Sequence, residues 1–140
     1  MTYRLFLDDV REPSDVGNYI HPVELRKQYR LYDWIIVRNY PEFCDKINEL
    51  GIPSIISFDH DLADVHYHSN VSDWEKETYD DPREFEDDYL KTGYHCAKWL
   101  IDKLTESNLP LPICYVHSMN PAGADNIKSI LRSYLKYFNF

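Results

Sequence analysis

The sequence has 140 residues, of which 44% are hydrophobic and 28% charged, and this composition excludes a disordered chain and suits a single domain. Its net charge of −9 argues against broad binding to nucleic acid or anionic membranes, and no apolar run approaches the roughly 20 residues of a membrane span. The three cysteines form no Cys-x-x-Cys pair, so we expect a cytoplasmic protein without a disulfide framework.

Short, nearly continuous apolar runs alternate with helical patterns along the chain. Continuous runs are typical of strands covered on both faces, and the alternation predicts an α/β domain over residues 1–140. We expect a mostly parallel four-stranded sheet with helices on both faces. The predicted order is strand Tyr3–Leu7, helix His21–Arg30, strand Trp34–Val37, helix Pro41–Leu50, strand Ser54–Phe58, a helix around Ala97–Leu104, strand Ile113–Val116 and a helix through Ile127–Phe138.

A long insert at residues 63–90 separates the third strand from the following helix. Residues 73–88 contain nine acids and two bases, so this stretch carries most of the acidic excess of the chain. A connection of this length in a small domain is typical of a lid, a binding loop or a mobile insert. A solvated acidic loop explains the same pattern, and a protein partner for it stays open.

Polar side chains follow the predicted strands at their carboxyl ends, where open parallel sheets bind ligands. Four carboxylates crowded at one edge repel one another, and a hard divalent cation relieves that repulsion. We therefore expect Mg²⁺ or Mn²⁺ here, although acid pairs also serve as helix caps or solvated loop entries. The expected metal ligands are Asp8 and Asp9 after the first strand and Asp59 and Asp61 after the third.

Two histidines lie among these strand ends and are candidates for acid–base chemistry. Histidine titrates near neutral pH, although a histidine at a strand end also serves as a structural hydrogen-bonding residue. The acids on both sides of His60 favour its protonated form and an acid or phosphate-binding role. His117, followed by Ser118, is then the candidate base or leaving-group acid.

The start of the last helix offers a candidate phosphate site. Asn120 fits the helix cap, Pro121 fits the first turn, and Gly123 permits close backbone approach. Amides at a helix start can hold a phosphate, and the guanidinium of Arg11 could clamp a phosphate oxygen. Plain capping and a surface salt bridge explain these residues equally well.

Four motifs together resemble the cyclic-phosphate-processing branch of the receiver-domain superfamily, found in bacteria and phages. They are Leu-Asp-Asp-Val-Arg-Glu-Pro at 7–13, Phe-Asp-His-Asp-Leu at 58–62, Thr-Gly-Tyr at 92–94 with Trp99-Leu100, and His-Ser-Met-Asn-Pro-Ala-Gly-Ala-Asp-Asn-Ile at 117–127. The resemblance covers nearly the whole chain except the insert. It implies a flavodoxin-like receiver fold and a role in processing cyclic phosphates on nucleotides or RNA ends.

The resemblance also implies roles by position. Asp8 and Asp9 match the metal-binding acid pair of receivers, Asp59 the phospho-accepting aspartate, Ser118 the hydroxyl after the fourth strand, and His60, Asp61, His117 and Asn120 the additions of this branch. A signalling receiver also has a fifth strand ending in a lysine that contacts the phosphoryl group. Lys136 instead falls in a predicted helix, which argues against a phosphorelay switch.

These observations predict a metal-dependent phosphoesterase that acts on a cyclic phosphodiester, for example a 2′,3′-cyclic nucleotide end. The expected catalytic residues are Asp59, His60, His117 and Ser118, and Asp59 as a covalent nucleophile is an open variant. The alternative is a non-catalytic receiver-like module that binds a nucleotide or a partner protein, with the acidic insert as its contact surface.

Overall fold

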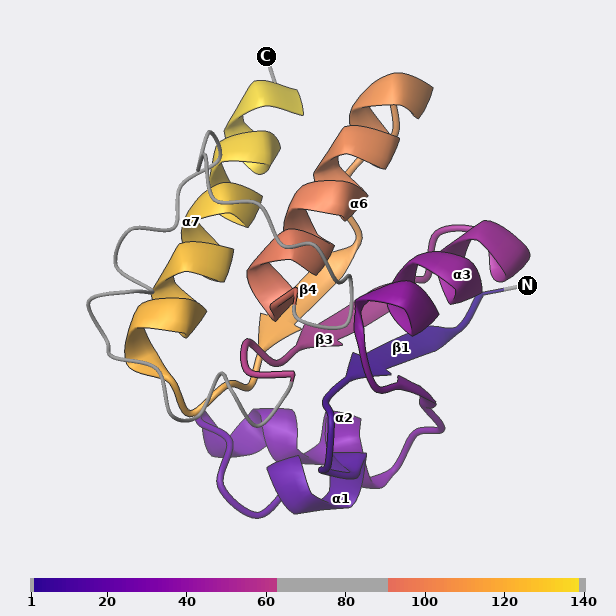
Figure 1. Cartoon of the computed structure of the whole chain (residues 1–140). Helices are drawn as coiled ribbons and strands as arrows, with labels where there is room; N and C mark the ends of the chain where they lie inside the picture. The colour runs from indigo at the N-terminus through magenta and orange to yellow at the C-terminus, as the bar shows by residue number, and fades with distance from the viewer. Residues whose placement is uncertain (1, 63–90, 139–140) are drawn as a thin grey trace.

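A four-stranded parallel sheet organises the fold in the computed structural model, which describes residues 2–62 and 91–138 (Figure 1). The strands lie in the spatial order β2-β1-β3-β4, and every neighbouring pair is parallel. The predicted strands are confirmed to within one residue at their first positions. Their bounds are β1 Arg4–Leu7, β2 Ile35–Val37, β3 Ile55–Phe58 and β4 Ile113–Val116.

Helices cover both faces of the sheet, as predicted for this α/β domain (Figure 1). One face carries α3, α6 and α7, and the other carries the short segments α1, η1 and α2. The helices are α1 Pro13–Val16, the 3₁₀ turn η1 Val23–Leu25, α2 Arg26–Arg30, α3 Tyr40–Leu50, α6 Gly93–Ser107 and α7 Pro121–Phe138. The acidic insert at 63–90 lies outside the described residues.

The first helical layer differs from the prediction. The helix expected over His21–Arg30 is divided into η1 and the five-residue α2, and the preceding His21–Pro22 peptide bond is cis. The additional helix α1 begins at Pro13, where Glu12 and Asp15 form a reciprocal capping box. Segments this short carry too little apolar periodicity to be recognised from sequence.

The continuous apolar strands are explained by burial on both faces. In β1, Leu5 and Leu7 pack in the large cluster beneath α3, α6 and α7, while Phe6 packs against α1 and α2. All three side chains are fully buried. No helix in the described part of the chain is long and apolar enough to cross a membrane.

The start of α6 approaches the end of β3 very closely. The N–H of Gly93 donates to the carbonyl of His60 at 2.8 Å, and a Cβ at position 93 would lie 1.7 Å from the carbonyl oxygen of Asp59. Thr92 caps the helix by accepting a hydrogen bond from the N–H of Tyr94 at 3.2 Å. Glycine is therefore required at position 93, and its close approach helps to fix the chain after β3.

Candidate functional site

Three strands deliver their first following residue to one buried point. Asp8 follows β1, Asp59 follows β3 and His117 follows β4, and one ligand atom from each lies within 4.8 Å of the others. All three residues are buried. Their main-chain N–H groups continue the sheet ladder, with Asp8 N 3.1 Å from Val37 O, Asp59 N 3.0 Å from Leu7 O and His117 N 2.9 Å from Phe58 O. The ladder thus holds each of these residues in place from its backbone.

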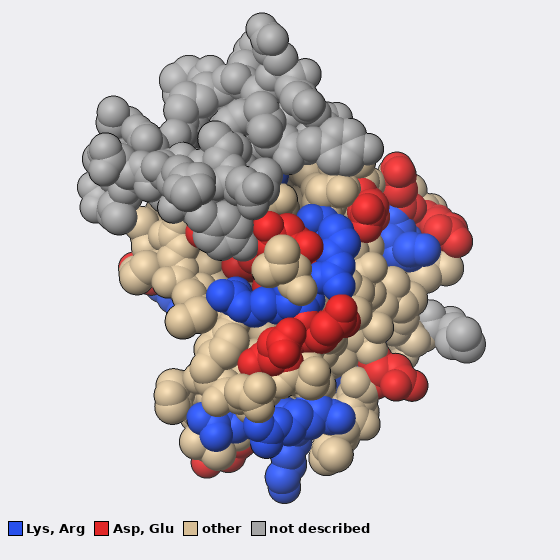
Figure 2. Space-filling model, turned by 60° about the horizontal axis from the view of Figure 1, so that its bottom comes forward, with Lys and Arg blue, Asp and Glu red and all other residues tan. Residues whose placement is uncertain are grey.

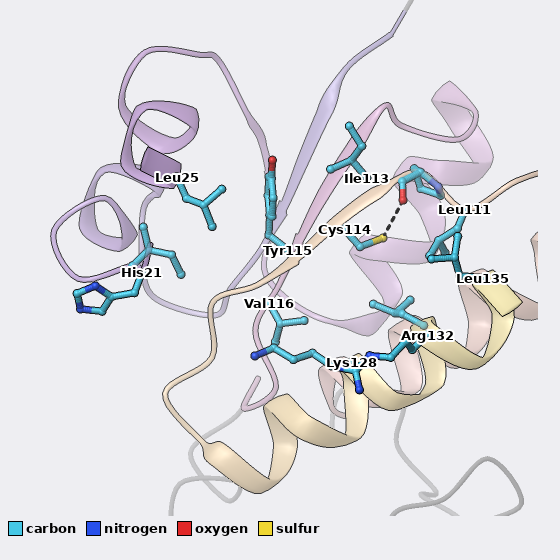
Figure 3. A pocket seen from close by; sticks show the side chains of 13 residues that line it. His21, Leu25, Leu111, Ile113, Cys114, Tyr115, Val116, Lys128, Arg132 and Leu135 are labelled. Carbon is cyan, nitrogen blue, oxygen red and sulfur yellow. Dashed lines mark hydrogen bonds between the residues drawn. The ribbon is translucent and has the colours of Figure 1, made fainter. Parts of the chain in front are cut away.

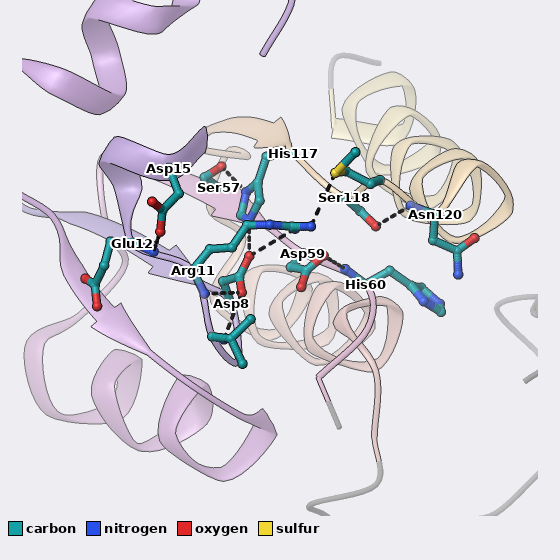
Figure 4. Close-up of polar contacts among 12 residues, drawn as sticks. Asp8, Arg11, Glu12, Asp15, Ser57, Asp59, His60, His117, Ser118 and Asn120 are labelled. Atoms are coloured by element: carbon teal, nitrogen blue, oxygen red, sulfur yellow. Dashed lines mark hydrogen bonds and ion pairs between the residues drawn. The ribbon is translucent and has the colours of Figure 1, made fainter. Parts of the chain in front are cut away.

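Asp8 is stabilised as a carboxylate. Its Oδ1 accepts from the N–H of Val10 at 3.0 Å and of Arg11 at 2.8 Å, and its Oδ2 lies 3.0 Å from His117 Nε2 (Figure 4). Burial raises the pKa of Asp8, but the hydrogen bonds from His117 and the two amides outweigh it and hold the pKa below its usual value. Asp8 is therefore charged at neutral pH.

His117 is fixed by hydrogen bonds at both ring nitrogens. Its Nδ1 lies 2.7 Å from Ser57 Oγ, and Ser57 Oγ lies 2.6 Å from the hydroxyl of Tyr29. Burial lowers the pKa of His117 despite the opposing effect of Asp8, so the ring is neutral at pH 7. Because charged Asp8 can only accept, Nε2 donates to Asp8, Nδ1 accepts from Ser57, and Ser57 accepts from Tyr29.

Sequence reasoning named Asp8 and His117 but missed Ser57 and Tyr29, which continue the hydrogen-bond chain from His117. Ser57 is the single hydroxyl in an otherwise apolar strand, and that signal could have drawn attention to it. Tyr29 gives no comparable signal, since it lies in a weakly patterned helix 28 residues away in sequence.

Asp59 is the least satisfied group of the site. Its Oδ1 accepts from the N–H of His60 at 2.9 Å, whereas its buried Oδ2 has no hydrogen-bond partner among the described residues. Burial, and then the charge of Asp8, raises the pKa of Asp59 well above its usual value, and Asp61 and Asp9 add to this effect. A cation between Asp8 and Asp59 would satisfy the orphaned oxygen and relieve the repulsion, so this cluster could hold a metal ion.

The other predicted carboxylates are arranged differently. Asp9 and Asp61 act on Asp59 through their charge, but neither belongs to the close group of ligand atoms among the described residues. Asp61 Oδ1 instead lies 2.8 Å from His60 Nδ1 and accepts from Asn120 Nδ2 at 3.2 Å. In Figure 4, the His60 ring extends from Asp59 on the side opposite Asp8, so the two histidines flank the central carboxylate.

The start of α7 closes against this second network. Asn120 caps the helix, because its Oδ1 accepts from the N–H of Gly123 at 3.0 Å. That amide is thereby engaged in the cap. A Cβ at Gly123 would lie 2.3 Å from Cγ of His60, so the absence of a side chain there lets the helix approach the imidazole. Gly123 thus has a packing role beside the predicted site.

A cavity of about 200 Å³ opens beside Asp59 and is lined by Arg11, Asp59, Asp61, Ser118, Met119 and Asn120. Arg11 spans it, with Nη1 3.5 Å from Asp8 Oδ2 and Nη2 3.3 Å from the sulfur of Met119 (Figure 4). Arg38 fastens the loop behind Arg11 by donating to the carbonyl of Arg11 at 2.7 Å and of Asp8 at 3.1 Å. The cavity therefore places the guanidinium of Arg11 next to the carboxylates of Asp8 and Asp59. This arrangement suits an anion that contacts both the guanidinium and a cation bound by the carboxylates.

The surface around this edge of the sheet carries both signs of charge. On the part of the face in Figure 2 that the described residues form, groups of basic side chains are separated by groups of acidic ones.

Replacing Asp59 by Asn tests whether ionisation of this buried carboxyl group destabilises the fold. Because the pKa of Asp59 is higher in the folded than in the unfolded chain, its contribution to stability is complete below about pH 4 and is lost as the pH rises through the folded pKa. In EDTA, we expect Asp59→Asn to exceed the wild type in free energy of unfolding at pH 7, and this advantage to vanish near pH 3. Urea unfolding across pH measures it.

The exposed carboxylate Asp45 on α3 supplies the control, since Asp45→Asn removes a surface carboxylate and should leave the free energy of unfolding at pH 7 within about 0.5 kcal/mol of the wild type. An Asp59→Asn variant that is less stable than the wild type at pH 7 without divalent cations would contradict the proposed repulsion.

The hydrogen bonds that connect His117 to Ser57 and Tyr29 predict that substitutions at Ser57 and at Tyr29 lower the free energy of unfolding by different amounts. Ser57→Ala leaves His117 Nδ1 and the Tyr29 hydroxyl buried without partners and should cost about 2–3 kcal/mol in unfolding free energy, whereas Tyr29→Phe should cost about 1 kcal/mol. The double variant should cost little more than Ser57→Ala alone. Urea denaturation gives all three values.

Tyr115 offers a matched control, because it packs on the same cluster and its hydroxyl has no hydrogen bond to the described residues. Tyr115→Phe should be near neutral. Equal or reversed costs for the two test variants would show that the Tyr29–Ser57–His117 order is wrong.

Comparison with known proteins identifies the family. The chain matches the family described as cyclic-phosphate processing receiver domain over residues 3–133, which is most of its length. No curated protein and no solved structure matches it. The match spans all four strands, the residues that meet at the candidate site and residues 121–133 of α7. The chain belongs to the cyclic-phosphate processing receiver domain family.

Proposed function

We propose that the protein is a metal-dependent phosphoesterase that hydrolyses a cyclic phosphodiester on a nucleotide or an RNA end. The observation that carries this proposal is the buried Oδ2 of Asp59, which lacks a hydrogen-bond partner in the described part of the chain. Asp59 lies beside charged Asp8 and lines a cavity that Arg11 spans. Such a site offers carboxylates to a cation and a guanidinium to a phosphate within one small cavity. The family description supports the cyclic phosphate as the substrate class.

Asp8 and Asp59 are the residues we propose to hold the cation. Their oxygen ligands suit Mg²⁺ or Mn²⁺, which also retain waters and accept phosphate oxygens. The bound cation would supply Lewis acidity toward a phosphoryl oxygen and would acidify a water ligand. Asp9 and Asp61 would add negative charge around it, because both already act electrostatically on Asp59.

His117 has a positioning role in this proposal. Its Nε2–H donates to Asp8 Oδ2, and Ser57 and Tyr29 fix the tautomer that makes this possible. The imidazole therefore orients the Asp8 carboxylate and supports its charge, as a neighbour of a metal ligand typically does. Tyr19 holds the backbone at this position by donating to the carbonyl of His117 at 2.9 Å.

The substrate phosphate would bind between Arg11 and the residues that follow β4. Arg11 supplies a guanidinium at one wall of the cavity, and Ser118 and Asn120 supply a hydroxyl and an amide at the other. His60 is hydrogen-bonded to Asp61, which lines the cavity, and in this proposal the pair would move a proton to or from a bound ester oxygen through the Asp61 carboxyl group. The two histidines then have different tasks, one at each side of Asp59.

Turnover of defined cyclic phosphates tests the proposal. The full chain is incubated with 2′,3′-cyclic AMP, 3′,5′-cyclic AMP and an RNA oligonucleotide ending in a 2′,3′-cyclic phosphate, with Mg²⁺, with Mn²⁺ or with EDTA. We expect hydrolysis that requires a divalent cation and falls by at least about 100-fold in Asp8→Asn and Asp59→Asn, as for loss of a group that stabilises the transition state. Phosphorus NMR follows the products, and Asp45→Asn controls for a general loss of carboxylate charge.

Three outcomes would overturn this proposal. They are no turnover of any of the three substrates, turnover that persists in EDTA, and turnover unchanged by both aspartate variants. Cation-dependent binding of a cyclic nucleotide without hydrolysis would favour a non-catalytic receiver-like module instead.

A further inference from the structure

A second, larger cavity lies along the outer edge of the sheet, apart from the candidate metal site. It has a volume of about 570 Å³, and residues 113–116 of β4 run along its floor (Figure 3). Ile20 and Leu25 form the wall on the side of α1 and α2, and Leu131 and Leu135 of α7 form the opposite wall. None of these residues takes part in the metal or phosphate chemistry proposed above.

The floor of this groove is an unpaired strand edge. Among the described strands, β4 pairs only with β3. On that side, the N–H of Ile113 donates to the carbonyl of Ser54 at 3.3 Å, and the N–H of His117 donates to the carbonyl of Phe58 at 2.9 Å. Successive residues of a strand direct their main-chain groups to opposite sides. The N–H and C=O groups of Cys114 and Val116 therefore point into the groove, ready to pair with another strand.

The groove has the shape of a vacant strand position. Helical layers on both faces of the sheet extend beyond β4, so an added strand would be covered above and below as β1 and β3 are. The four residues of β4 offer about 13 Å of edge at the usual rise of a strand. Ile113 remains 57% exposed at this edge, which leaves apolar surface for an added strand to bury.

Charge distinguishes between possible occupants. Lys128 and Arg132 lie one helical turn apart on the α7 wall, both are exposed, and neither forms an ion pair with a described residue (Figure 3). Symmetric pairing of β4 with β4 of a second copy would bring two such basic pairs to the same interface, which is unfavourable. A strand carrying a carboxylate toward α7 would instead pair with them.

We propose that the edge of β4 binds an extended segment of a partner protein as a fifth strand. The segment has apolar side chains toward the two walls and an acidic side chain toward Lys128 and Arg132. Main-chain hydrogen bonds to Cys114 and Val116 provide affinity, and the basic pair provides selectivity for acidic sequences. This interaction is independent of the reaction proposed for the metal site.

Selection from a library of displayed random peptides of about 12 residues tests this proposal with the full chain. We expect the enriched peptides to combine alternating apolar residues with an acid, and to shift the amide NMR signals of Cys114 and Val116. Affinity should fall at least 10-fold for Lys128→Glu and should be unchanged for Lys136→Glu, a charge reversal on the same helix outside the groove. N-methylation of the enriched peptide at alternate amides should abolish binding in one register only.

The proposal is overturned if no acidic peptide is enriched, or if Lys128→Glu and Lys136→Glu bind the enriched peptide equally. It is also overturned if N-methylation in neither register weakens binding, since the peptide would then not form a strand. A concentration-dependent dimer that Lys128→Glu alters would assign the groove to a second copy of the chain instead.

Discussion

The repulsion between two buried carboxylates is the constraint around which the site is built. Asp8 and Asp59 end neighbouring parallel strands, and the ladder fixes both backbones, so neither side chain can leave the other's vicinity. The two carboxyl groups differ in the number of hydrogen bonds that they accept. Asp8 accepts hydrogen bonds from two amides and an imidazole, whereas one buried oxygen of Asp59 has no partner within residues 2–62 and 91–138. Asp8 is therefore a stabilised carboxylate, whereas Asp59 is a carboxyl group with an unsatisfied oxygen and a raised pKa. A cation bound between them would satisfy that oxygen and relieve the repulsion.

The remaining polar groups can be understood from this pair. On one side, Tyr29 and Ser57 hold His117 in the tautomer that donates to Asp8. On the other side, His60 and Asn120 contact Asp61, and the glycine at the start of α7 lets that helix close against the imidazole. The first network joins the ends of β1 and β4 to α2, and the second joins the end of β3 to the start of α7. The site is thus held by both layers of the fold, which favours a fixed geometry around the central carboxylates.

The sequence predicted the parallel sheet because strands buried on both faces are nearly continuous apolar runs, as in β1 and β3. It also predicted that residues after three strand ends would lie at one edge, a consequence of parallel topology. The sequence could not predict which of the four acids would lie close enough to share a cation. The orientation of Asp61 toward His60, for example, depends on the path of the chain after β3. The contribution of Tyr29 depends on a tertiary hydrogen bond, and the groove beside β4 on helical layers that extend past an edge strand. Neither leaves a periodic signal in the sequence.

The most direct test of the account is a titration of stability with Mg²⁺ and Mn²⁺ at pH 7. If Asp8 and Asp59 share a cation, either ion should raise the free energy of unfolding of the wild type, by about 2.7 kcal/mol at 100 times its dissociation constant. Asp59→Asn should show no such increase in the same range, even though we expect it to be more stable than the wild type in EDTA. An equal increase in the two proteins, or none in the wild type, would contradict a cation site at these carboxylates.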